Sequence, residues 1–110
     1  MTRDEHLMTI AAEECAEVAQ RISKALRFGL TEVQPGQTMT NAERIRQEYS
    51  DLAAALEMIG IGAPLGKWMD DKRAKVEKYL AYSAELGTLT VLPDTAGAAS
   101  PDPTDGSRRP

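Results

Sequence analysis

Two short stretches of the chain each place two carboxylates three residues apart. The first pair is Glu14 and Glu17, and the second is Glu48 and Asp51. On a helix this spacing is close to one turn, so both carboxylates of a pair project from the same face. Two such pairs on neighbouring helices would gather four negative charges, which would weaken the fold unless a cation neutralised them. We therefore expect a site for a hard divalent cation, with Mg²⁺ as the first choice.

The available donor atoms narrow the choice of metal. The one histidine, His6, lies far in the sequence from both acidic pairs, so the Glu-x-x-His motifs of a di-iron carboxylate bundle are missing. A site made only of oxygen donors favours Mg²⁺, with Mn²⁺ as a substitute, over zinc or iron. In proteins Mg²⁺ commonly binds one or two carboxylates together with substrate phosphates. This combination is typical of nucleotide hydrolysis.

The first pair lies on a helix predicted from about residue 4 to residue 28. Its apolar stripe, found from a helical periodicity of about 100° per residue, consists of Leu7, Ala11, Val18, Ile22 and Ala25. Glu14 falls in the middle of this stripe, and Glu17 lies on its flank with Lys24 two turns further on. An acid in an apolar stripe is costly unless something pairs with it, so Glu14 is expected to have a partner. Gly29 is expected to end the helix in a left-handed conformation.

The second pair lies on a helix that follows a predicted loop at residues 30–39. Thr40 and Glu43 have the spacing of a capping box and mark the start of this helix. Glu48 borders its apolar stripe, and the glycines and proline at residues 60–64 are expected to end it. The stripe itself consists of Ile45, Tyr49, Leu52, Leu56 and Ile59.

A third helix is predicted from about residue 64 or 65 to residue 85. It carries the only concentrated basic surface of the chain, followed by aromatic side chains: Lys72, Lys75, Tyr79 and Tyr82. The lysines fit a solvated face as well as they fit a phosphate contact. We expect an all-α domain at residues 1–87 and a disordered Pro-, Gly- and Ala-rich tail at residues 88–110.

Composition limits the partners and the compartment. The net charge of −4 argues against general nucleic-acid binding. A single cysteine suits a reducing cytoplasm, and no apolar run is long enough to span a bilayer. Three helices of about 20 residues rarely make a secure monomer. We therefore expect a cytoplasmic homodimer or homotetramer that completes its helical bundle between chains.

The acidic pairs together resemble the E-E-x-x-E…E-x-x-D signature of the MazG-like all-α nucleoside triphosphate pyrophosphohydrolases. In this chain the signature reads Glu13-Glu14-Cys15-Ala16-Glu17 and Glu48-Tyr49-Ser50-Asp51. The flanking segments at residues 23–29 and 75–83 are similar to those of small phage-borne and bacterial members. The resemblance covers roughly residues 5–86.

The resemblance implies Mg²⁺-dependent cleavage of a (d)NTP between its α- and β-phosphates, which gives the monophosphate and pyrophosphate. The bound metal would lower the pKa of a water molecule, and one carboxylate would accept its proton. The metal ligands and catalytic residues implied are Glu14, Glu17, Glu48 and Asp51. Glu13 matches the first letter of the signature, but the helix phase turns it away from Glu14, so its role stays open.

The resemblance also suggests which residues would bind the rest of the substrate. The cations that would neutralise the departing pyrophosphate are Lys24, Lys75 and Lys78. The candidates for stacking on the base are Tyr79, Tyr82 and Trp68. Two alternatives remain open. The chain could be a non-catalytic helical oligomer that binds a structural cation or a basic partner, or an enzyme that hydrolyses phosphoribosyl-ATP.

Overall fold

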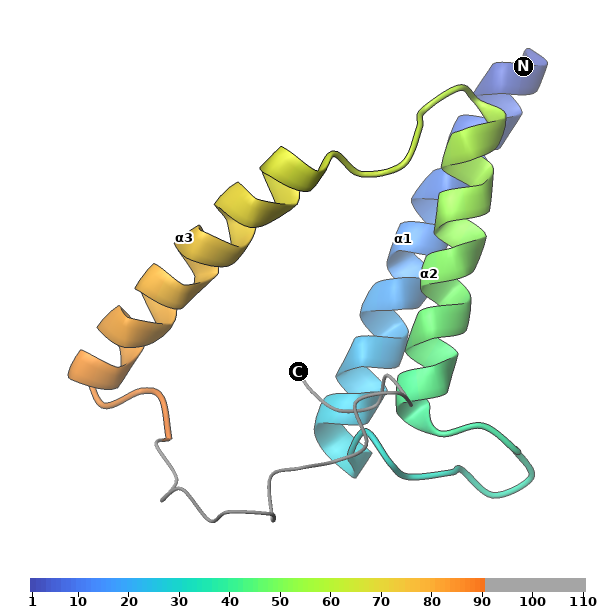
Figure 1. Ribbon diagram of the computed structural model, residues 1–110. Helices are drawn as coiled ribbons and strands as arrows, with labels where there is room; N and C mark the ends of the chain where they lie inside the picture. Colours follow the sequence, from blue (N-terminus) through green and yellow to red (C-terminus); the bar gives the residue numbers. More distant parts are fainter. Residues whose placement is uncertain (91–110) are drawn as a thin grey trace. The chain divides into compact units, whose positions relative to one another are not determined.

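The computed structural model describes residues 1–90, and within that range it contains three α-helices and no strand, which confirms the all-α prediction. The helices are α1 (Arg3–Phe28), α2 (Asn41–Met58) and α3 (Gly66–Glu85) (Figure 1). They belong to two units, Met1–Gly62 with α1 and α2, and a second unit that begins at Ala63 and contains α3. Of the predicted tail, residues 91–110 lie outside the described residues. No helix in the described range is both long and apolar enough to cross a bilayer.

Both helices of the first unit begin with a capping box. At α2 the Thr40 hydroxyl accepts from the Glu43 amide at 3.1 Å, and the Glu43 carboxylate accepts from the Thr40 amide at 2.8 Å, as predicted. Thr2 and Glu5 form the same reciprocal pair at α1, where the sequence analysis did not use this signal. Gly29 ends α1 with a positive φ of 98°, but its ψ of 150° is extended. The prediction of a left-handed conformation at Gly29 is therefore wrong for ψ.

The helices α1 and α2 lie side by side and run in opposite directions (Figure 1). Small side chains dominate the buried positions between them, which are Leu7, Ala11, Ala25, Ala42 and Ala55. Small residues let two helix backbones approach closely. Ile22 and Tyr49, both members of the predicted apolar stripes, are exposed. Each helix has a single neighbour within this unit. The contact between α1 and α2, which we call the seam, therefore covers only part of the width of each apolar stripe.

The connection between α1 and α2 is held by the first residue of α2. The side chain of Asn41 is 3% exposed, and its Nδ2 donates to the Gly29 carbonyl at 2.8 Å and to Glu32 Oε1 at 2.9 Å. Two backbone bonds add to this clamp, from Asn41 N to the Glu32 carbonyl and from Ala42 N to the Leu30 carbonyl, both 3.0 Å. The end of α1 is therefore fixed directly to the start of α2.

The second unit consists mainly of α3, which has no buried residue. Its two ion pairs, Lys67 with Asp71 and Arg73 with Asp70, lie on its exposed surface, where such pairs contribute little stability. Its large apolar side chains are exposed as well, among them Trp68, Tyr79, Leu80 and Tyr82.

Replacing Asn41 with Ala should lower the free energy of unfolding by about 1–3 kcal/mol, because the Gly29 carbonyl and the Glu32 carboxylate lose a buried donor. Urea denaturation followed by circular dichroism measures this change. The control is Gln37→Ala, an exposed position in the same loop. Equal stabilities of the two variants would show that the clamp contributes nothing.

Candidate metal centre

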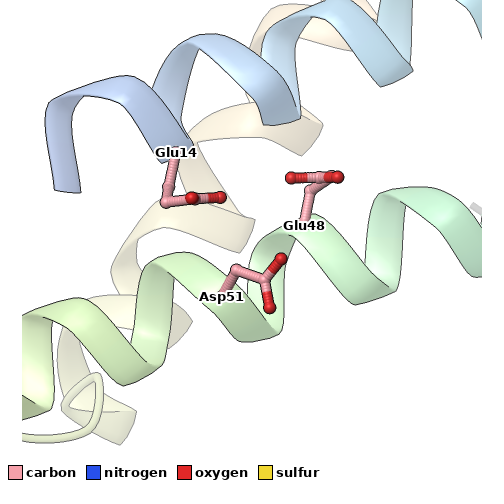
Figure 2. A group of neighbouring side chains, drawn as sticks. All are labelled: Glu14, Glu48 and Asp51. Carbon is pink, nitrogen blue, oxygen red and sulfur yellow. The ribbon is translucent and has the colours of Figure 1, made fainter. Parts of the chain in front are cut away.

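Three of the four predicted acids meet across the seam between α1 and α2. Glu14 projects from α1, and Glu48 and Asp51 project one turn apart from α2 (Figure 2). One carboxylate oxygen from each residue lies within 4.8 Å of the other two. We call Glu14, Glu48 and Asp51 the acidic triad. Its members come from two helices, so the packing of α1 on α2 creates the site.

The acidic triad lies at the edge of the seam. Glu14 and Glu48 are half-buried, and Asp51 is exposed, so the group opens to solvent on one side. Oε2 of Glu14 is buried without a hydrogen-bond partner among the described residues. A buried acceptor without a donor costs free energy. A hard cation that accepts oxygen ligands would supply the missing interaction, so this donor set fits Mg²⁺.

The pKa of Glu14 reflects the same crowding. Burial raises this pKa above its ordinary value, and the negative charges of Asp51 and Glu48 raise it further. The charge of Glu17 acts in the same direction. Without a cation, the carboxyl group of Glu14 is therefore harder to ionise than an ordinary glutamate carboxyl group.

Glu17, the fourth predicted ligand, is not part of this convergent group. It lies one turn beyond Glu14 on α1 and is exposed. Its charge still raises the pKa of Glu14, so it lies close enough to the acidic triad for electrostatic coupling. Its role as a ligand stays a prediction. Glu13 is exposed beside Glu14.

The predicted substrate-binding residues divide between the two units. Lys24 is half-buried on α1. The others lie on α3 with exposed side chains: Lys75, Lys78, Tyr79, Tyr82 and Trp68. Trp68 lines a shallow, open concavity of about 330 Å³ together with Leu65, Met69 and Lys72. The roles of these residues in phosphate binding and base stacking stay predictions.

The sequence analysis missed two arginines of the seam. Arg21 on α1 and Arg44 on α2 are both half-buried. Nε of Arg21 is buried without a hydrogen-bond partner among residues 1–90, and Nη1 of Arg44 donates to Gln34 Oε1 at 3.0 Å. A signal was present in the sequence, because each arginine lies seven residues from a predicted acid and so on the same helix face.

Comparison of the chain with family models, with curated proteins and with solved structures found no match. The resemblance to the MazG-like enzymes therefore rests on the signature residues and the flanking segments at residues 23–29 and 75–83. The function of the acidic triad has to be argued from the chemistry of its own side chains.

The raised pKa of Glu14 predicts how pH affects the metal-free chain. The folded chain holds this proton more tightly than the unfolded chain, so the resulting stabilisation is fully present below the ordinary pKa of 4.5 and is lost as the pH rises through the raised pKa. The free energy of unfolding should fall across that interval. The variant Glu14→Gln, which cannot ionise, should lose this part of the fall and be the more stable chain at neutral pH.

Urea denaturation in EDTA at a series of pH values measures both effects. Glu13→Gln is the matched control, because it removes the same charge from the exposed neighbouring position and should keep the pH dependence of the original chain. Identical pH profiles for the original chain and Glu14→Gln would contradict the prediction.

Proposed function

We propose that the chain is a Mg²⁺-dependent nucleoside triphosphate pyrophosphohydrolase, which cleaves a (d)NTP to the monophosphate and pyrophosphate. The observation that carries this proposal is the convergence of three carboxylates within 4.8 Å, one of them with a buried oxygen that has no hydrogen-bond partner in the described part of the chain. Such a group is suited to a hard cation that also binds phosphates. The match of these residues to the MazG-like signature supports the choice of reaction.

The chain's own residues would divide the work as follows. Glu14, Glu48 and Asp51 would hold Mg²⁺, which when bound neutralises phosphate charge and makes a water molecule more acidic. Glu17 is the predicted acid that lies outside the acidic triad and faces solvent. It is therefore available to accept the proton of the attacking water. The oxygen of this water bonds to the α-phosphorus. The bond from that phosphorus to the oxygen that bridges to the β-phosphate breaks, and pyrophosphate leaves.

Substrate binding and assembly complete the proposal. Lys24, Lys75 and Lys78 would neutralise the departing pyrophosphate, and the aromatic residues Trp68, Tyr79 and Tyr82 would stack on the base. Many large apolar side chains are exposed on α3, and the seam of the first unit buries mostly alanines. We therefore also propose a cytoplasmic homodimer or homotetramer in which chains cover each other's apolar faces.

A second candidate function follows from the raised pKa of Glu14. Any divalent cation that relieves this crowding would stabilise the fold without catalysis, so the chain could be a cation-stabilised helical oligomer. Thermal unfolding with Mg²⁺ alone, and with Mg²⁺ plus a non-hydrolysable dNTP, separates the two functions. Only the enzyme should gain a further, nucleotide-dependent increase in Tm.

The reaction is tested by pyrophosphate release from the eight common (d)NTPs, with Mg²⁺ and with EDTA. We expect Mg²⁺-dependent release from one or a few of them, and a loss of at least about 100-fold in Glu48→Gln, because even residues that only support a metal ligand cost 10–100-fold. Glu57→Gln, an exposed acid on the same helix, is the control and should keep full activity. Release from none of the eight, together with none from phosphoribosyl-ATP assayed in the same way, would reject a hydrolase of this class.

Sedimentation equilibrium tests the assembly. We expect a mass of two or four times the 12.0 kDa chain. Replacing Leu80, an apolar residue exposed on α3, with Asp should shift the distribution toward the monomer, whereas Lys67→Glu at a polar position of the same helix should not. A monomer at all concentrations of the original chain would contradict the proposed assembly.

A further inference from the structure

Two buried side-chain atoms in the described part of the chain lack hydrogen-bond partners, and both lie on α1. They are Oε2 of Glu14, an acceptor, and Nε of Arg21, a donor. Seven residues separate Glu14 from Arg21, which is close to two turns, so both lie on the same helix face about 10 Å apart along the axis. Buried polar atoms in folded proteins nearly always have partners. The seam therefore carries an unmatched negative group and an unmatched positive group about two turns apart on one helix face.

Arg44 on α2 lies at the same level along the helix axes as Arg21 on α1. Because α1 and α2 are antiparallel (Figure 1) and Glu14 meets Asp51, seven residues forward from Glu14 and seven residues back from Asp51 reach the same level. These steps lead to Arg21 and Arg44, both half-buried. Each step is close to two full turns, so each arginine lies on the same helix face as the acid from which it was counted. Arg21 and Arg44 therefore lie at one level of the helix pair, about two turns nearer the loop than the acidic triad, and we call them the basic layer.

The loop holds Arg44 in place. Its Nη1 donates to Oε1 of Gln34 at 3.0 Å, and Gln34 belongs to the segment that Asn41 clamps to the start of α2. A guanidinium has five N–H donors, so most of the donors of Arg44 remain for other partners. The ion pairs found within residues 1–90 lie on α3, and no carboxylate in that range neutralises Arg21 or Arg44.

We propose that Arg21 and Arg44 form the subsite for the phosphate groups of a ligand whose metal ion is held by the acidic triad. Phosphate oxygens match the forked donors of a guanidinium, and the cation satisfies the buried oxygen of Glu14. A metal-bound di- or triphosphate carries the cation at one part of its chain and further oxyanions along it, so one such ligand would contact both the acidic triad and the basic layer, which lie about two turns apart. For the identity of the metal this inference rests on the proposed function.

Inorganic pyrophosphate is the probe that tests the subsite without requiring turnover. Isothermal titration calorimetry of the full chain in Mg²⁺ should show pyrophosphate binding that weakens at least about tenfold in both Arg21→Gln and Arg44→Gln, because each variant removes a charged hydrogen-bond donor. Arg46→Gln removes the same charge from an exposed position of α2 and should bind pyrophosphate normally. Titration with Mg²⁺ alone should give an unchanged or higher affinity in the two seam variants, since they leave the acidic triad intact.

Several outcomes would overturn the subsite. These are no pyrophosphate binding by the original chain, normal binding by the seam variants, or an equal loss in Arg46→Gln, which would indicate general charge rather than a site. If Arg21→Gln does not fold, Arg21→Lys keeps the charge without the fork and should still weaken binding, and Arg44→Gln tests the opposite helix independently.

The subsite and the proposed hydrolase can fail separately. Pyrophosphate binding that depends on both arginines, without turnover of any nucleotide, would support the subsite and reject the hydrolase. Nucleotide hydrolysis that is indifferent to both substitutions would support the hydrolase and reject the subsite.

Discussion

The crowding of three carboxylates within 4.8 Å is the constraint on which the rest of the first unit depends. Like charges at this distance repel, and the apolar seam weakens the solvation that would otherwise screen Glu14. The packing of α1 on α2 brings Glu14 to Glu48 and Asp51. The free energy lost there has to be recovered by the helix contacts or by a bound cation, and this links the stability of the chain to its proposed chemistry.

The sign of the charged side chains also changes along the length of the seam. The acidic triad forms one layer, and Arg21 with Arg44 forms another layer about two turns nearer the loop. Charges of opposite sign this far apart attract each other weakly through a partly solvated seam, and neither layer forms an ion pair with the other in the described residues. A ligand that carries both a cation and negatively charged groups would bind the acidic triad and the two arginines more strongly than the triad and the arginines attract each other.

Much of this unit could be predicted from helix periodicity and capping signals. The extents of α1 and α2, the Thr40–Glu43 cap and the meeting of Glu14 with Glu48 and Asp51 all followed from spacing. Periodicity gives the face of a residue but not the width of the contact that covers it, so the exposure of Ile22 and Tyr49 could not be foreseen. The same limit applies to Glu17, which has the same three-residue spacing from Glu14 as Asp51 has from Glu48 but does not join the acidic triad. The arginines were missed because phosphate-binding cations were sought only among lysines, at Lys24 and on α3.

The alanines of the seam have a further consequence, for the axial register of the two helices. Small side chains make shallow knobs, which resist sliding of one helix along another less than large interlocking residues do. A slip of one turn is about 5.4 Å, more than the 4.8 Å that contains the acidic triad. The register must then be set largely at the loop, where Asn41 ties Gly29 and Glu32 to the start of α2. Insertions between Gly29 and Asn41 would thus separate the acidic triad from a distance, without altering any of the three carboxylates.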